Sequence, residues 1–222
     1  MLHKLLAKHP VSMNILGGPF RGARMLLNPS DSKRKIFGIY EHVLNEWITK
    51  ATVNKQFVLD IGANTGYDTY GFAYLLSKNN SDNPCVLAFE PDTFEELDVP
   101  KQWDVYSSVH IEILKKYVGS ITNESTITID DVLREYSTRL KGAGLIKIDI
   151  EGGEIDALKG ASKLLDDDRH DWLIEIHGKD LIPGVAKYFV DRERPFLIKE
   201  LTPVPFLGAE LRPQYTPWLV TI

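Results

Sequence analysis

The sequence predicts an α/β fold in which a mostly parallel, seven-stranded sheet lies between two layers of helices. From residue 57 onward, short apolar runs with few polar breaks alternate with helical stretches, which is typical of a parallel sheet covered on both faces. The last two strand-like segments, 196–201 and 218–222, are joined by a proline-containing loop without a helical pattern. They should pair in antiparallel fashion, because parallel neighbours need a long crossover.

The first part of the chain has a different pattern. Residues 1–7 are amphipathic and predict a short helix, a Gly/Pro-rich stretch follows at 16–22, and 23–27 are strand-like. Apolar residues recur at helical spacing between residues 33 and 50, which predicts an amphipathic helix.

We therefore divide the chain into an N-terminal extension, residues 1–56, and an α/β domain, residues 57–222. Before the final pair, the domain's predicted strands are 57–61, 86–89, 109–114, 145–150 and 172–176. Its predicted helices are 67–77, 93–97, one that begins at 129, 155–165 and 183–190.

Composition excludes several classes of protein. With 43% apolar and 10% aromatic residues, the chain is not intrinsically disordered. The net charge of −5 is uneven, because residues 1–56 hold nine Lys/Arg and three Asp/Glu while the remainder holds 17 and 28. The acidic remainder argues against a nucleic-acid partner. A single cysteine, Cys85, excludes an intramolecular disulfide framework and suits a reducing compartment.

Targeting and membrane signals are not expected. No apolar run approaches the roughly 20 residues of a transmembrane helix. Lys8, His9 and Pro10 end the amphipathic N-terminus before a signal-peptide core could form. The sequence therefore predicts a cytoplasmic protein without membrane insertion.

The sharpest motif follows the first strand of the domain. Asp60 ends the apolar run, Gly62 and Gly66 lie four residues apart, and a helix follows. The glycines let a ligand approach the backbone, and amides at the helix start favour an anionic group such as a carboxylate. Asn64 departs from the dinucleotide fingerprint, and no Gly-Lys-Ser/Thr follows for a P-loop. Because Asp60 would repel a pyrophosphate and attract an ammonium, the ligand should be a zwitterion with a cationic centre.

A second acid ends the next strand. Glu90 follows the apolar run 86–89 and precedes Pro91, and a carboxylate at this place typically accepts hydrogen bonds from a ribose diol. Taken alone, Asp60 could be a helix N-cap and Glu90 an acid of a turn. Together with the glycine loop, the two acids predict a site for a ribose-containing ligand.

Polar side chains also end two later strands, where a covered sheet should be apolar. Asp149 alternates with isoleucines along one strand, and Glu175 and His177 alternate with isoleucines along the next. Open α/β sheets bind ligands at the carboxyl ends of their strands, and unpaired buried polar groups are costly. We therefore take these three as the candidate catalytic residues. Lys147 is interpreted as an ion-pair partner of one acid and Glu154 as a capping residue of the next helix.

These motifs resemble a class I S-adenosylmethionine-dependent methyltransferase, and more narrowly the FkbM family, whose known members include O-methyltransferases. The motifs that carry the resemblance lie at 58–66, 89–91, 146–154, 159–161 and 174–177. The resemblance implies a Rossmann-like fold, S-adenosylmethionine as cofactor and methyl transfer as activity. The cofactor-binding residues that it implies are Asp60, Gly62, Asn64, Gly66, Glu90 and Pro91.

Three aromatic residues have two possible roles. The segment 113–117 lacks the polar residue that usually fixes the adenine in such proteins, so Tyr117 could stack on the base or simply pack. Tyr40 and Trp47 are interpreted as core residues, with a place in the acceptor pocket as the alternative.

Methyl transfer to a hydroxyl requires removal of its proton, and two routes fit the candidate residues. His177, whose unperturbed pKa would be about 6.5, could act as general base, oriented by Glu175 or Asp149. Alternatively, Asp149 and Glu175, with Glu151 or His177, could hold Mg²⁺ or Mn²⁺, and the ion would lower the pKa of the hydroxyl. The sequence favours the general base, because no compact set of three acids is evident.

The expected reaction is O-methylation of a small molecule or sugar. A basic extension that acts as a lid would favour an anionic acceptor, although its charges could instead pair with the acidic remainder of the chain. Two other functions fit parts of the pattern. One is an NAD-dependent oxidoreductase, against which the altered glycine pattern argues, and the other is a non-catalytic S-adenosylmethionine-binding regulatory or interaction protein.

Overall fold

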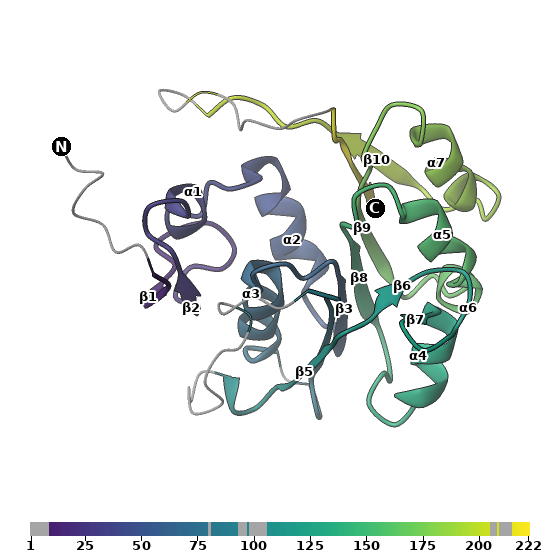
Figure 1. The fold of residues 1–222 in the computed structure, drawn as a ribbon, viewed down its shortest axis with the longest axis horizontal. Coiled ribbons are helices and arrows are strands. Elements are labelled where there is room, and N and C mark those ends of the chain that lie inside the picture. The colour runs from purple at the N-terminus through teal and green to yellow at the C-terminus, as the bar shows by residue number, and fades with distance from the viewer. Residues whose placement is uncertain (1–8, 80, 93–96, 98–105, 205–207, 209–214) are drawn as a thin grey trace.

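The computed structural model describes residues 9–79, 81–92, 97, 106–204, 208 and 215–222. In this part of the chain, a central twisted sheet carries helices on both faces (Figure 1). Two small ladders, β1 with β2 and β6 (Tyr117–Val118) with β7 (Thr126–Ile127), lie outside the central sheet. None of the helices in the described ranges has the length and hydropathy needed to cross a bilayer.

Seven strands form the central sheet in the order β10-β11-β9-β8-β3-β4-β5. Their bounds are β3 (Phe57–Ile61), β4 (Cys85–Phe89), β5 (His110–Leu114), β8 (Gly144–Ile148), β9 (Asp171–Glu175), β10 (Phe196–Lys199) and β11 (Trp218–Thr221). The pairs from β5 to β9 are parallel, whereas β11 runs antiparallel to both β9 and β10. The predicted α/β fold, with its mostly parallel sheet and antiparallel final strand, is confirmed.

The parallel register brings the ends of the inner strands to one edge of the sheet. Ile61 at the end of β3 is paired with Phe89 of β4 and with Ile148 of β8. Every residue of these three strands is buried, which is why each strand is a nearly continuous apolar run. The loops that follow them therefore emerge side by side along this edge.

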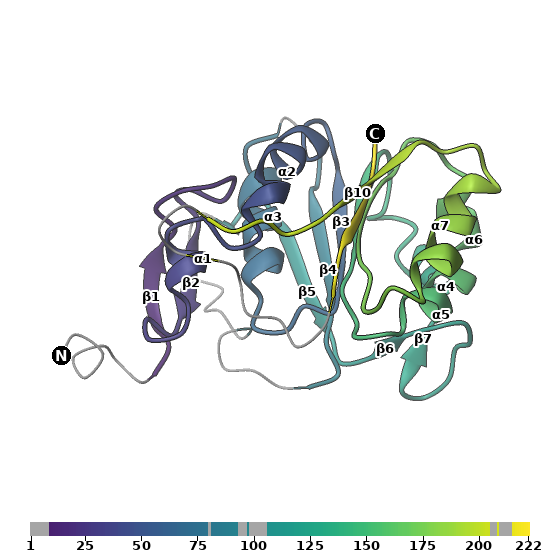
Figure 2. The same cartoon turned by 90° about the horizontal axis from the view of Figure 1, so that it is seen from above.

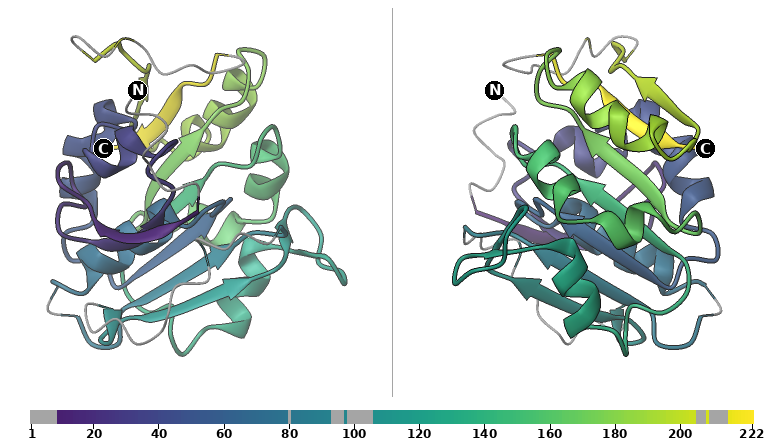
Figure 3. Two further views of the ribbon diagram at one scale, coloured as in Figure 1. Left: turned by 60° about the vertical axis from the view of Figure 1, so that its left-hand side comes forward. Right: turned by 90° about the vertical axis from the view of Figure 1, so that its right-hand side faces the viewer.

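Four helices cover one face of the sheet, as Figures 2 and 3 show. They are α4 (Ile129–Glu135), α5 (Glu154–Lys159), α6 (Ser162–Leu165) and α7 (Ile182–Val190). The expected single helix over 155–165 is wrong, because the chain breaks at Gly160 between α5 and α6. A Cβ at Gly160 would lie 2.3 Å from the carbonyl oxygen of Gly119, so a close backbone approach takes the place of a helical turn. The expected helix at 93–97 lies outside the described residues except for Leu97.

The N-terminal extension covers the opposite face together with α3 (Tyr67–Leu76), as Figure 2 shows. Its elements are β1 (Val11–Asn14), β2 (Arg24–Leu27), α1 (Lys33–Ile36), the 3₁₀ turn η2 (His42–Leu44) and α2 (Asn45–Ala51). Phe20 and Leu44 of the extension belong to the same apolar cluster as Val58 of β3 and Phe72 of α3. A Cβ at Gly71 would lie only 2.5 Å from the ring of Phe20. The extension is thus packed tightly on the sheet.

The extension differs from its sequence prediction in one respect. A single helix over 33–50 is wrong, because the backbone is left-handed at Gly38 (φ 66°) and at Glu41 (φ 48°). At Gly38 the chain crosses the 17–18 backbone so closely that a Cβ would lie 2.0 Å from the Gly17 carbonyl. The strand expected at 23–27 is present as β2, its partner β1 was not predicted, and the helix expected at 1–7 lies outside the described residues.

Candidate active site

The glycine loop after β3 is held in a conformation that few other residues could adopt. Gly62, Asn64 and Gly66 all have positive φ, at 84°, 48° and 80°. A Cβ at Gly62 would lie 1.8 Å from the carbonyl oxygen of Asp149, so the loop passes directly against the loop that follows β8. The Gly62 and Ala63 amides donate to the carbonyl oxygen of Phe89. The loops after β3, β4 and β8 are therefore joined to one another.

Glu90 ties the end of β4 to the glycine loop. Its Oε2 accepts a hydrogen bond from the backbone amide of Asn64 at 2.7 Å, and its Oε1 accepts one from the amide of Asp92 at 3.1 Å. The residue is only 8% exposed. Its carboxylate therefore lies fixed at the wall of the cavity described below.

Asp60 lies beneath the glycine loop and is fully buried. Its carboxylate accepts hydrogen bonds from the hydroxyl of Thr69 at 2.5 Å and from the ammonium of Lys147 at 3.1 Å. Lys147 also donates to the carbonyl oxygen of Gly62 at 3.1 Å. Asp60 thus supports the loop from below. A ligand ammonium, which the sequence analysis expected Asp60 to attract, would have to compete with Lys147 for it.

Lys147 is the shared cation of three carboxylates. Its Nζ lies 3.1 Å from Asp60, 3.5 Å from Asp68 and 3.6 Å from Asp149. Burial disfavours the charged lysine, but the three acids together raise its pKa above the ordinary value. Burial also raises the pKa of Asp68 to about 6, against the opposing influence of Lys147. The predicted ion-pair role of Lys147 is confirmed, and the ion pairs connect the glycine loop with the Asp149 carboxylate.

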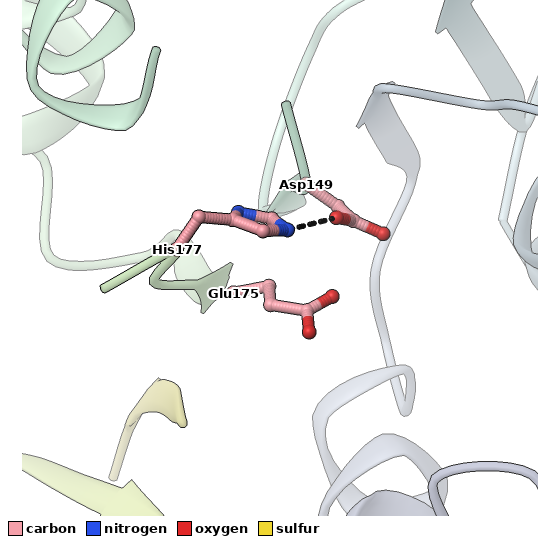
Figure 4. Close-up of side chains that lie close together, drawn as sticks. All are labelled: Asp149, Glu175 and His177. Carbon is pink, nitrogen blue, oxygen red and sulfur yellow. Dashed lines mark ion pairs between the residues drawn. The ribbon is translucent and has the colours of Figure 1, made fainter. Parts of the chain in front are cut away.

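Asp149, Glu175 and His177 lie together beyond the ends of β8 and β9. Figure 4 shows Asp149 and His177 pointing toward each other, with the Glu175 carboxylate beside them. One ligand-type atom from each residue lies within 4.8 Å of the other two, and Nε2 of His177 is 3.5 Å from Oδ1 of Asp149. Glu175 is 2% exposed, while the other two are partly open to the cavity. Polar and apolar side chains alternate along these two adjacent strands, and the polar ones at the strand ends form a cluster of two acids and an imidazole.

A fourth residue, Glu154, orients His177 from behind. Glu154 is the first residue of α5 and is fully buried. Its Oε1 accepts from Nδ1 of His177 at 2.6 Å and from the amide of Gly152 at 3.0 Å. Because a carboxylate accepts hydrogen bonds, Nδ1 carries the hydrogen in this arrangement and Nε2 faces Asp149. Burial lowers the pKa of His177, but the hydrogen bond to Glu154 and the charges of Asp149, Glu154 and Glu151 outweigh it and raise the pKa overall.

One cavity of about 660 Å³ runs from the glycine loop to this cluster. Its lining residues are Tyr40, Ile61, Gly62, Asn64, Phe89, Glu90, Pro91, Asp92, Lys116, Tyr117, Val118, Asp149, Ile150, Glu151, Gly153, Glu175, His177 and Thr216. Carboxylates outnumber ammonium groups among them, and the Lys116 ammonium donates to the carbonyl oxygen of Glu124 at 3.1 Å. The cavity therefore has an acidic wall suited to a cationic ligand.

The extension contributes to this cavity through Tyr40. The Tyr40 ring packs edge-on against Tyr67 at 5.8 Å, and the Lys35 ammonium lies 5.1 Å from its centre. Tyr40 thus lines the cavity and also packs against the apolar cluster, as the prediction of a core residue required. Trp47 is outside it, and its Nε1 donates to the carbonyl oxygen of Thr221 at 2.7 Å.

Most residues singled out from the sequence line the same cavity. These are Gly62, Asn64, Glu90, Pro91, Asp149, Glu175 and His177, whereas Asp60 and Gly66 lie behind its wall. Sequence reasoning missed Glu154 as the partner of His177, because an acid at a helix start is typical of a capping residue. The signal that could have found it is the Gly-Gly-Glu turn directly after the strand of Asp149, which returns the acid toward the neighbouring strand.

The fold and the family match together define the class of protein. The sheet order is that of a Rossmann-like α/β fold, which a solved FkbM methyltransferase shares. Residues 104–197 match the family described as the Methyltransferase FkbM domain. This match covers less than half of the chain, and it agrees with the resemblance that the motifs predicted.

The chain is similar to several solved structures. The FkbM methyltransferase of Methylobacillus flagellatus KT is 18% identical with a TM-score of 0.52, and the match covers 85% of this chain and 54% of that one. The fibrillarin pre-rRNA processing protein of Methanococcus jannaschii is 13% identical over 82% and 74% of the two chains, with a TM-score of 0.49. Aeropyrum pernix fibrillarin, solved with natively bound S-adenosylmethionine, is 10% identical over 82% and 73%, with a TM-score of 0.49.

The chain spans about half the length of the Methylobacillus protein that it matches. No curated protein sequence matches it. Identity at this level shows the fold alone, so any indication of activity has to come from the residues of the cavity.

Proposed function

We propose that this protein transfers the methyl group of S-adenosylmethionine to a hydroxyl oxygen of a small molecule or sugar. The observation that carries the proposal is the single cavity whose lining includes the glycine loop, the fixed Glu90 carboxylate, and the cluster of Asp149, Glu175 and His177. The FkbM domain and the fold support the same activity. The buried, single Cys85 suits a reducing compartment, and we propose the cytoplasm as the location.

The residues of the cavity fit S-adenosylmethionine in size and charge. Its volume of about 660 Å³ lies in the range of roughly 300–1,000 Å³ that small-molecule sites occupy. The ligand carries a sulfonium and an ammonium, and the acidic wall would favour both. Glu90 would accept the hydrogen bonds of the ribose hydroxyls, and the 62–64 backbone would lie against the amino-acid portion. Tyr117, which lines the cavity near Glu90's loop, would stack on the adenine.

When bound, S-adenosylmethionine supplies a methyl group on a positively charged sulfur, which is a good leaving group. The acceptor oxygen forms the new O–CH₃ bond, the S–CH₃ bond breaks, and its electron pair stays on sulfur. The protein then has to hold the acceptor in line with the methyl group, a contribution of about 7–11 kcal/mol where orientation is good, and to accept the hydroxyl proton. Asp149, Glu175 and His177 are the groups at the end of the cavity that can do so.

Two routes remain for the proton. In the first, Nε2 of His177 takes it, and Glu154 holds the imidazole and stabilises the imidazolium, as a carboxylate does behind a catalytic histidine. In the second, Asp149 and Glu175, with Glu151 or His177, would hold a divalent ion, which would supply a lower pKa for an acceptor hydroxyl bound to it. In the first route, the acid that orients the imidazole is Glu154, and not Glu175 or Asp149 as the sequence predicted.

The cofactor assignment is tested by calorimetric titration with S-adenosylmethionine and, separately, with NAD. We expect S-adenosylmethionine to bind and NAD not to bind. Glu90→Gln should raise the Kd for S-adenosylmethionine by roughly 5- to 150-fold, because losing a charged hydrogen-bond acceptor costs about 1–3 kcal/mol. Glu124→Gln, on an exposed turn outside the cavity, is the matched control. Unchanged affinity in Glu90→Gln would rule out the ribose assignment.

Transfer itself is tested with a methyl-labelled cofactor and a panel of hydroxyl-bearing small molecules and sugars. His177→Gln should lower turnover while leaving the Kd for S-adenosylmethionine within about threefold, because His177 lies at the acceptor end of the cavity. A protein that binds the cofactor and methylates no acceptor in the presence of Mg²⁺ or Mn²⁺ would favour the non-catalytic alternative.

A further inference from the structure

In the described part of the chain, the cations paired with Asp149 are Lys147 and, when protonated, His177. Glu154 receives the Nδ1 hydrogen of His177, so in the neutral imidazole the lone pair on Nε2 faces Oδ1 of Asp149, 3.5 Å away. A lone pair opposite a carboxylate oxygen is repulsive unless a cation lies between the two. The buried Glu175 carboxylate adds a second negative charge to the same space. The cluster therefore requires either a proton or a metal ion at this point.

Lys147 does not fill this position. Its ammonium lies 3.6 Å from Oδ2 of Asp149, whereas the imidazole faces Oδ1 of the same carboxylate. The hydrogen bonds of Lys147 go to Asp60 and to the carbonyl oxygen of Gly62, below the glycine loop. Asp149 thus has one oxygen toward the lysine and the other toward His177 and the cavity.

The distances suit a divalent ion. Ligand atoms at about 2.1 Å from one ion are separated by about 3.0 Å when adjacent and about 4.2 Å when opposite in octahedral geometry. The 3.5 Å between His177 and Asp149 falls between these values. A pair at the 4.8 Å limit of the set would have to close by about 0.6 Å to become opposite, or by about 1.8 Å to become adjacent. A histidine held from behind by a buried acid is also a recurrent arrangement around metal ions, because the acid fixes the ring and its tautomer.

We propose that Asp149, Glu175 and His177 bind a divalent metal ion, with Glu154 as the positioning residue of His177. The inference rests on the proposed function for its role, since the ion would hold the acceptor hydroxyl in the cavity that the glycine loop also lines. Two carboxylates and one imidazole favour Mn²⁺ over Mg²⁺, because imidazole is a poorer ligand for Mg²⁺. Three protein ligands leave coordination positions for the acceptor, and the added positive charge makes an acidic cavity compatible with an anionic acceptor.

The test measures metal binding directly, without cofactor or acceptor. The EDTA-treated full-length protein is titrated with Mn²⁺, and free Mn²⁺ is followed by electron paramagnetic resonance. We expect one Mn²⁺ per chain. Asp149→Asn and His177→Gln should each weaken binding by at least tenfold, and Glu154→Gln should weaken it by about 10- to 100-fold through the orientation of His177. Asp92→Asn removes a carboxylate from the same cavity but outside the cluster, and should change the affinity less than twofold.

Two results would overturn the inference. One is no binding of Mn²⁺ up to 1 mM, roughly the weakest affinity found among protein sites for divalent cations. The other is equal affinity in the wild-type, Asp149→Asn and His177→Gln proteins. Circular dichroism shows whether each variant is folded, and the two ligand variants provide independent answers, because Asp149 and His177 belong to different strand ends.

A parallel titration with S-adenosylmethionine in EDTA separates this inference from the proposed function. If the cofactor binds but Mn²⁺ does not, the metal-site inference is wrong, and His177 remains the proposed base of the methyltransferase. If Mn²⁺ binds but the cofactor does not, the metal-site inference stands and the proposed methyl transfer is wrong.

Discussion

Replacing Lys147 by Met should be the most destabilising conservative change in the site. Lys147 is 2% exposed, and its ammonium lies within 3.6 Å of three carboxylates, one of which, Asp60, is fully buried. Removing one partner of a buried ion pair leaves an uncompensated charge and typically costs about 3–5 kcal/mol. Since Asp60 keeps its hydrogen bond from Thr69, we expect a loss of about 3 kcal/mol at pH 7.

The loss should depend on pH in a defined direction. Without the Lys147 cation, Lys35 is the remaining lysine that acts on Asp68 among the described residues, and protons must neutralise more of the clustered negative charge. Burial already raises the pKa of Asp68 to about 6. A group whose pKa is raised on folding contributes stability at low pH and loses it as the pH rises through the folded value. Lys147→Met should therefore be less destabilised at pH 6 than at pH 8.

The assay is urea unfolding followed by tryptophan fluorescence, in a double-mutant cycle. Asp60→Asn with Lys147→Met should recover at least half of the lost stability, because the double variant has no buried charge left at that pair. The exposed Lys141→Met should stay within about 0.5 kcal/mol of the wild-type protein. A loss below 1 kcal/mol in Lys147→Met, or no recovery in the double variant, would refute the ion-pair reasoning.

Two further changes test the loop and the core. Gly62→Ala should lose more than about 2 kcal/mol of stability, because it combines a positive φ with a Cβ placed 1.8 Å from a backbone oxygen. Gly152→Ala, with a similar φ of 99° but open space around it, should lose clearly less, and equal losses in the same urea experiment would contradict the steric argument. Burial lowers the pKa of His170 to about 4, so this neutral histidine stabilises the fold above pH 6.5, and up to about 3 kcal/mol is lost as the pH falls toward 4. His170→Gln should flatten stability between pH 4 and 6.5, and an unchanged slope would show that another group is responsible.

The sequence predicted the sheet well because its strands are buried on both faces. A strand such as β3, buried at every residue, is a nearly continuous apolar run, and such a run can be recognised without knowing its neighbours. The predicted helix over 33–50 failed for the opposite reason. Its apolar spacing is real, but the close approach of Gly38 to the 17–18 backbone breaks the helix, and no local pattern contains a contact made 20 residues away.

The strand-end residues of the candidate site, like the strands themselves, were predicted from local patterns in the sequence. Strand periodicity and the rule that ligands bind at strand ends were sufficient to select Glu90, Asp149, Glu175 and His177. The partners of these groups were not predictable, because an acid near a helix start has the same sequence signature whether it caps the helix or holds an imidazole. The predicted capping role of Glu154 is wrong, because α5 has no side-chain cap and the Glu154 carboxylate accepts instead from His177 and from the Gly152 amide before the helix.

The sequence by itself determined the fold class, the functional edge of the sheet and the residue types gathered there. Apolar periodicity and the positions of strand ends are local properties, and they do not change with the exact packing. The tertiary structure decided which charges meet: Lys147 beneath the loop with Asp60, and His177 between Glu154 and Asp149. Charge pairing changes over a few ångströms, and those distances are set by sheet register, by loop conformation and by backbone contacts between distant segments.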